Sequence, residues 1–221
     1  MAGKVSYPPP TNEELRSVLN AVAKKNVTLA RLFELMVYTG LRYSDASVLT
    51  FDQMMINGVP RKKVSVVQSK THGKRLHFLK VACEKEDYAD DDIKRLKAKI
   101  KKKSTVNLAI SAQAAEVVTA CFENAKETRK FLFPSGRSRI EKPYSIRTAN
   151  HVLNQVAREL KLDYPLGTHS FRKSTARMIT EAGGTIYHVR DQLGQSSVQV
   201  TDSYMKTFTS EHDEFAKMIQ F

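Results

Sequence analysis

Four short stretches of the sequence carry side chains that could hold an anion, transfer a proton or act as a nucleophile. Arg42 follows a glycine and precedes a short predicted helix, so its guanidinium can project from a fixed backbone corner. His169 and Arg172 are three residues apart and would share one face of a helix. Tyr204 could be a surface phenol, a filler of the core or a nucleophile. The four stretches are residues 38–45 (YTGLRYSD), 69–74 (SKTHGK), 168–173 (THSFRK) and 193–206 (LGQSSVQVTDSYMK).

Each stretch also has an ordinary structural explanation. An arginine after Gly-Leu is most often a surface residue, and a lysine in a turn, such as Lys70, is usually only solvated. A His-x-x-Arg pair is common on helices that have no catalytic role. A tyrosine in a polar helix often rests its ring on the core and leaves its hydroxyl in water. Only the order and the context of the four stretches favour a site.

The charge of the chain gives the first indication of a partner. Lys and Arg number 36 against 23 Asp and Glu, a net charge of +13, and residues 61–103 hold fifteen basic and six acidic residues. A basic stretch of this kind suits a phosphate polyanion, although a merely solvated surface would look the same. The candidate DNA contacts are Arg61, Lys62, Lys63, Lys74, Arg75 and Lys173.

Several classes of protein are disfavoured by composition. No apolar run reaches the length of a membrane span, and the first residues lack the apolar core of a signal peptide. Cys83 and Cys121 are far apart, which predicts neither a disulfide framework nor a metal site. We therefore expect an intracellular protein with two incidental thiols.

Hydrophobic periodicity predicts an α+β fold that is mainly helical with a small antiparallel sheet. Thr11 and Glu14 fit a capping box that begins the first helix, and Gly40 can end the second. Strands are predicted at 64–67, 76–79 and 106–110, with a hairpin turn at 69–74 between the first two. Further helices are expected near 44–49, 112–125, 145–161, 170–182, 185–193 and 197–206.

The predicted organisation has three parts. Residues 1–10 contain three consecutive prolines and are expected to form a linker or the edge of a cloned fragment. Residues 11–206 are predicted to form one domain with a charged insert at 83–103, helical from about Asp92. Residues 207–221 are predicted to form a tail helix.

The four stretches together resemble the catalytic domain of the tyrosine recombinases, the phage integrase family. The matching residues are TGLRYSD (39–45), QSKTHGK (68–74), THSFRKSTARM (168–178) and LGQSSVQVTDSY (193–204), in the family's order. The resemblance runs from about Thr11 to the end of the chain. It implies a site built from Arg42, Lys70, His169, Arg172, Gln195 and Tyr204.

Two positions depart from the family pattern or leave a choice. The family usually has His or Trp at Gln195; a glutamine amide also donates hydrogen bonds but carries no positive charge, so we expect reduced or retuned activity. Lys74 and the lysines at 101–103 compete with Lys70, which fits the family's Ser-Lys-Thr-x-Gly turn best.

The resemblance implies a defined reaction. Arg42 and Arg172 would clamp the nonbridging oxygens of a phosphodiester while Tyr204 attacks the phosphorus and forms a 3′-phosphotyrosyl bond. A phenol ordinarily has a pKa of about 10, so His169 would serve as base or proton relay. Lys70, on a mobile hairpin, would protonate the departing 5′-oxygen. A 5′-hydroxyl from another strand would then reseal the DNA.

The resemblance therefore implies a site-specific DNA recombinase or integrase that acts on double-stranded DNA as a homotetramer, without metal, cofactor or membrane contact. The protein would be DNA-associated, in the cytoplasm or nucleoid if the host is a prokaryote. The tail at 207–221 either docks on a neighbouring subunit or folds back on its own domain. Because the family usually carries an N-terminal core-binding domain, we expect a catalytic fragment of a longer protein. Two alternatives stay open: a type IB topoisomerase-like relaxing enzyme, and a DNA-binding module whose active site is weakened at Gln195.

Overall fold

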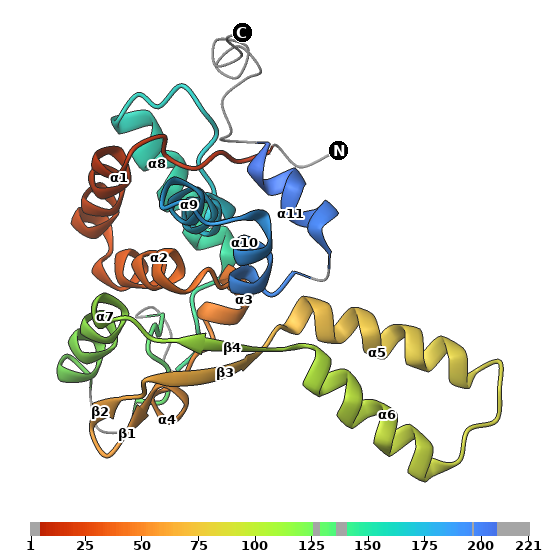
Figure 1. Ribbon diagram of the computed structural model, residues 1–221. Coiled ribbons are helices and arrows are strands. Elements are labelled where there is room, and N and C mark those ends of the chain that lie inside the picture. The colour runs from red at the N-terminus through yellow and green to blue at the C-terminus, as the bar shows by residue number, and fades with distance from the viewer. Residues whose placement is uncertain (1–4, 126–128, 136–140, 196, 207–221) are drawn as a thin grey trace, which may run out of the picture. The chain divides into compact units, whose positions relative to one another are not determined.

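The computed structural model describes residues 5–125, 129–135, 141–195 and 197–206, which divide into two compact units (Figure 1). One unit runs to Leu41 and resumes at Tyr144, and the other is Arg42–Pro143. The expected class, a mainly helical chain with small antiparallel sheets, is confirmed. Among the described residues no helix combines the length and hydropathy of a membrane span.

The first unit is a helical bundle organised around α9 (Thr168–Glu181). This helix packs against α2 (Val27–Thr39), α8 (Ile146–Glu159), α10 (Ile186–Leu193) and α11 (Val198–Met205), while α1 (Asn12–Lys25) packs on α2 and α8. Phe33 of α2 and Phe171 of α9 stack with ring centroids 4.3 Å apart, and both are fully buried. The helix that carries His169 and Arg172 is therefore fixed on several sides.

The predicted N-cap of the first helix is present, but the structure shows only the Thr11 half of the predicted capping box. Thr11 caps α1 by accepting the N–H of Glu14 at 3.1 Å, whereas the Glu14 carboxylate accepts the hydroxyl of Tyr164 at 2.7 Å. Gly40 ends α2 with φ = 68°, a left-handed conformation. A Cβ at Gly40 would lie 2.8 Å from the Leu193 side chain, so this glycine also permits α10 to approach the end of α2.

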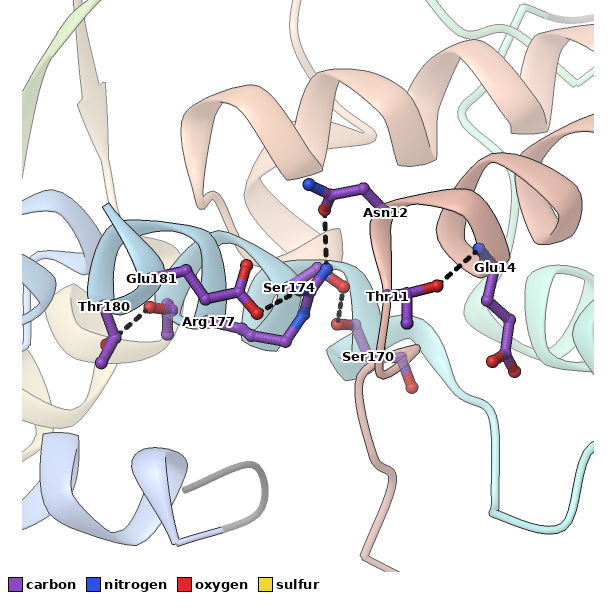
Figure 2. A network of polar contacts seen from close by, with 9 residues as sticks. Thr11, Asn12, Glu14, Ser170, Ser174, Arg177, Thr180 and Glu181 are labelled. Carbon is purple, nitrogen blue, oxygen red and sulfur yellow. Dashed lines mark hydrogen bonds and ion pairs between the residues drawn. The ribbon is translucent and has the colours of Figure 1, made fainter. Parts of the chain in front are cut away.

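A second buried arginine ties α9 to the start of α1 (Figure 2). Arg177 donates to the Glu181 carboxylate at 2.5 Å and to the Asn12 side chain at 2.8 Å. The Arg177 side chain is only 5% exposed, whereas the Glu181 side chain is half exposed, so the ion pair lies at the edge of the bundle. Because a buried charge is expensive without partners, these contacts hold the two helices together.

The segment before α1 packs onto the same unit. Pro8 and Pro9 are buried, and the N–H of Tyr7 donates to the carbonyl of Pro165 at 3.0 Å. The Ser6 carbonyl accepts from the Lys173 ammonium at 2.6 Å. Residues 5–9 thus form a strap across the bundle where the sequence suggested a linker.

The second unit holds two small sheets. Strand β1 (Met55–Ile56) pairs with β2 (Val59–Pro60), and β3 (Lys63–Val67) pairs antiparallel with β4 (Thr105–Ala109), Val66 opposite Val106. Short helices α3 (Tyr43–Ala46) and α4 (Phe51–Met54) precede them, and α7 (Ala112–Glu123) follows. The predicted strands at 64–67 and 106–110 are confirmed, as are the helices from 112 to 206 within one to three residues at most ends.

The predicted strand at 76–79 and hairpin turn at 69–74 are wrong. This segment forms α5 (Ser69–Cys83), which with α6 (Asp90–Lys103) makes a helical arm between β3 and β4 (Figure 1). Leu76 and Leu79 of α5 are half-buried and three residues apart, a helical spacing, so the short apolar run 76–79 belongs to a helix. Gly73 sits in the helix interior with open space around it.

The charged end of the predicted insert behaves as expected. Asp90, Asp91 and Asp92 occupy the first turn of α6, and the lysines at 101–103 occupy its last turn. This order opposes the helix dipole and so stabilises the helix at both ends. The tail predicted at 207–221 lies outside the described residues.

Candidate active site

His169 and Arg172 lie one turn apart at the start of α9, as their spacing predicts. Gly167 precedes the helix in extended conformation, and its N–H donates to the Ser170 hydroxyl at 3.1 Å, which fixes the first turn. His169 is exposed, whereas Arg172 is fully buried. The same turn therefore presents an imidazole to solvent and holds a guanidinium beneath it.

The buried Arg172 guanidinium is held by two helix ends. It donates to the carbonyl of Gly40, which caps α2, at 2.5 Å and to the carbonyl of Leu193, the last residue of α10, at 2.8 Å. Carbonyls at helix C-termini carry partial negative charge and lack partners within their own helix. Three helices thus converge on one cation, and their carbonyls help to explain how this arginine can be buried here.

Tyr204 of α11 reaches the same place from the end of the chain. Its hydroxyl lies 3.2 Å from Nδ1 of His169, and its ring lies over the Arg172 guanidinium at 5.9 Å. The ring also packs on the buried cluster of Ala176, Val189 and Leu193. When Nδ1 is unprotonated it accepts the phenolic hydrogen bond, so the imidazole can take the phenol's proton directly.

Lys173, a predicted DNA contact, is buried instead of lying on a free surface. Its ammonium donates to the Ser6 carbonyl and lies over two rings, Tyr7 at 5.8 Å and Tyr204 at 5.6 Å. Burial lowers the pKa of Lys173 below its ordinary value. The strap before α1 is thereby connected through one cation to the candidate nucleophile.

Gln195 follows the left-handed residue Gly194 that ends α10. Its backbone N–H donates to the Arg190 carbonyl at 2.9 Å, which fixes the position of the residue. Both polar atoms of its side chain are buried and have no hydrogen-bond partner among the described residues. A buried amide left in this state costs about 1–3 kcal/mol, so a ligand that offered it an acceptor would be favoured.

Arg42 and Lys70 belong to the second unit, and their place at the site stays a prediction. Arg42 precedes α3 as its N-cap residue, two positions after Gly40 in the chain, and Nη1 is buried without a hydrogen-bond partner among the residues described. Lys70 is exposed in the first turn of α5, not in a hairpin turn. Its backbone is therefore held by a helix.

Sequence reasoning missed the role of Asp45. This carboxylate is 2% exposed and accepts both the N–H of Ser69, at 3.0 Å, and the Ser69 hydroxyl. A negative charge at the N-terminus of α5 is favourable because of the helix dipole. Asp45 thus joins the stretch that contains Arg42 to the residue before Lys70, and an acid three residues after Arg42 was the available signal.

The other predicted DNA contacts differ in their exposure and hydrogen bonding. Lys62, Lys63 and Lys74 are exposed and Arg61 is half-buried. Arg75 donates to the Lys103 carbonyl and, at 3.1 Å, to the Ser104 hydroxyl, so it ties the base of the arm together. No group of three His, Cys, Asp or Glu within the described ranges could hold a metal ion.

We expect Asp45→Ala to lower the free energy of unfolding by about 2–3 kcal/mol, because charged hydrogen bonds of this kind each contribute about 1.5–3 kcal/mol. Urea unfolding followed by circular dichroism measures the change. The control is Asp52→Ala, an exposed acid in the same unit, which should stay within about 0.5 kcal/mol of the wild type. An Asp45→Ala midpoint equal to that of the control would contradict the anchoring role.

Comparison with known proteins agrees with this geometry. The chain matches the Phage integrase family over residues 11–211 and belongs to that family. No curated protein matches it in sequence.

Solved structures give the same fold at low sequence identity. XerA recombinase has a TM-score of 0.63 at 13% identity over 99% of this chain and 64% of its own. A lambda integrase bound to a core site as a dimer has a TM-score of 0.64 at 17% identity, over 95% of this chain and 62% of its own. The catalytic domain of bacteriophage HP1 integrase has a TM-score of 0.56 at 18% identity, over 96% of this chain and 94% of its own. The chain thus spans under two thirds of the first two proteins and nearly all of the third.

Proposed function

We propose that this chain cuts and rejoins DNA strands at specific sites through a covalent 3′-phosphotyrosyl intermediate at Tyr204. The observation that carries the proposal is the contact of the Tyr204 hydroxyl with His169 Nδ1, directly above the Arg172 guanidinium. A phenol, a proton acceptor and a permanent cation meet at one point. Family membership supports the same conclusion.

In the proposed reaction the Tyr204 oxygen attacks the phosphorus and its proton passes to His169. The bond from phosphorus to the 5′-oxygen breaks, and Lys70 protonates that oxygen as it leaves. Arg172 and Arg42 stabilise the negative charge that builds up on the nonbridging oxygens. A 5′-hydroxyl then attacks the phosphotyrosine by the reverse path, so the bond energy is kept and no external energy source enters.

Gln195 fits this scheme as a neutral donor to a phosphate oxygen. Its side-chain amide has two N–H groups, and the buried Nε2 gains an acceptor when a phosphate arrives. The charge of the usual histidine is missing, so we expect transition-state stabilisation weaker than in the family pattern. Arg172 and Arg42 would then supply the positive charge that stabilises the nonbridging phosphate oxygens.

We propose double-stranded DNA as the substrate and a homotetramer as the assembly. The protein would therefore be found associated with DNA. Solved relatives support this: lambda integrase has been seen as a dimer on a core site and as a tetramer on a Holliday junction. The net charge of +13 suits the polyanion. Exchange of the tail at 207–221 between subunits is part of the proposal.

The proposal is tested by covalent capture from a library of nicked duplexes with randomised sequences. A nick beside the cleaved bond lets a short strand diffuse away, which traps the attached protein. Wild-type protein should yield complexes that resist denaturing detergent, with enriched sequences, phosphotyrosine after digestion and a free 5′-hydroxyl on the released strand. No adduct, or attachment to a 5′ end, refutes it, while plasmid relaxation without recombinants indicates a topoisomerase.

A further inference from the structure

The helical arm made by α5 and α6 has an uneven distribution of charge. Neither helix contains a buried residue, so nearly all of the arm's side chains face solvent or its own seam. All six acidic residues of the arm lie at its tip, between 84 and 92. Ser69–Cys83 contains no acid, and neither do residues 94–103, which hold seven lysines and arginines. The base of the arm is therefore basic, and its tip is acidic.

One face of α5 combines two lysines with an exposed aromatic ring. Lys70, Lys74 and Phe78 are spaced by four residues and so lie in a row along the helix. Lys70 and Lys74 are exposed, and Phe78 is 60% exposed. The Lys74 ammonium lies over the Phe78 ring, 5.7 Å from its centroid, and the centroids of the His77 and Phe78 rings are 6.3 Å apart.

The phenylalanine does not serve the packing of the arm. Helices α5 and α6 pack against each other and their Leu76, Leu79, Ile93 and Ile100 are half-buried, whereas Phe78 is mostly exposed. An exposed aromatic side chain beside two ammonium groups is the combination that binds nucleic acid, where cations meet phosphates and the ring meets sugars or bases. A partner protein would need an acidic surface to match the same face.

The row has a defined length and a defined starting point. From Lys70 to Phe78 the helix advances about 12 Å, at about 1.5 Å per residue. Successive phosphates on one strand advance about 3.4 Å along the duplex axis, so a helix of this length that lies along the axis covers about three to four nucleotides. DNA that places a phosphate at Lys70 and runs along α5 therefore meets Phe78 before it approaches the acidic tip.

We propose that the face of α5 formed by Lys74 and Phe78 binds duplex DNA about three to four nucleotides from the cleaved phosphate. Lys74 contacts a phosphate, and Phe78 packs against the sugar or the base edge next to it. The acidic tip keeps the distal part of the arm away from the polyanion. The position relative to the cleaved phosphate rests on the proposed function; the DNA contact itself does not.

The test measures affinity for a labelled 30-base-pair duplex as a function of salt, with the full chain carrying Tyr204→Phe so that no cleavage occurs. We expect Phe78→Ala to weaken binding severalfold, because it removes apolar surface that the duplex would bury. Lys74→Ala should weaken it severalfold and lower the salt slope by about 0.9. Phe78→Tyr should bind like the parent.

Two matched controls lie off this face. Lys85→Ala removes an exposed lysine at the acidic tip, and Tyr187→Ala removes an aromatic ring that is 57% exposed and carries the Arg190 guanidinium at 5.4 Å. Both should bind DNA like the parent protein. Equal melting temperatures for all variants exclude unfolding, since none of the replaced side chains is buried.

The proposal is overturned if Phe78→Ala and Lys74→Ala bind like the parent, or if the controls lose as much affinity. It is also overturned if Phe78→Ala changes only self-association, because the face then belongs to a second copy of the chain. Failure of strand cleavage in the wild type would remove the proposed function and leave this binding result standing.

Discussion

Tyr204→Phe protein is expected to form no covalent adduct with DNA while binding the duplex as tightly as the wild type. The substitution removes one oxygen, and with it the contact to His169 Nδ1. The ring stays, so its packing on the Ala176, Val189 and Leu193 cluster and its position over Arg172 are kept. The measurement is the detergent-resistant adduct on a captured nicked duplex, set beside the affinity for the same duplex.

His169→Gln provides the graded comparison for this result. Loss of a positioned general base typically slows a reaction by about 10²–10⁴, so this variant should form adduct slowly instead of not at all. Tyr187→Phe, a change at an exposed tyrosine on α10, should leave the rate unchanged. Adduct from Tyr204→Phe protein at the wild-type rate would mean that another side chain is the nucleophile.

The parts of the fold that could be predicted are those whose signals are local. A continuous apolar face from Leu29 to Val37 and a glycine at its end suffice to define α2. The segment 69–79 failed because its few apolar residues fit either period, and a Ser-Lys-Thr-His-Gly-Lys run resembles a turn. What decided it was the partner of β3, which is β4 forty residues away in sequence. Pairing between strands that far apart in sequence cannot be predicted from the residues next to either strand.

The candidate site divides in the same way. The spacing of His169 and Arg172 places them on one helix, and the order of motifs picked out Tyr204. The partners that hold these residues come from distant segments: Gly40 for Arg172, Ser6 for Lys173 and Asp45 for Ser69. The partners at Gly40 and Ser6 are backbone carbonyls, which every residue has. No residue type in the sequence could therefore predict these two contacts.

Arg172→Ala is expected to lower both the cleavage rate and the stability of the protein. Loss of one charged donor to the transition state typically costs about 10²–10³ in rate. The change also leaves the Gly40 and Leu193 carbonyls without their partner, at about 1–3 kcal/mol for each buried group. Adduct formation under saturating DNA and urea unfolding measure the two effects separately.

A second buried arginine on the same helix separates catalysis from folding. Arg177→Ala breaks contacts to the half-exposed Glu181 carboxylate and to Asn12, so it should destabilise the protein, but less than Arg172→Ala does. Assayed at a temperature where both variants are folded, it should cleave DNA at nearly the wild-type rate. Arg172→Lys retains the charge but not the fork that spans two carbonyls, so its rate should stay low. Equal rates for the Arg172→Ala and Arg177→Ala variants at that temperature would show that Arg172 serves only the fold, because Arg172 is the one that lies beneath the Tyr204 ring.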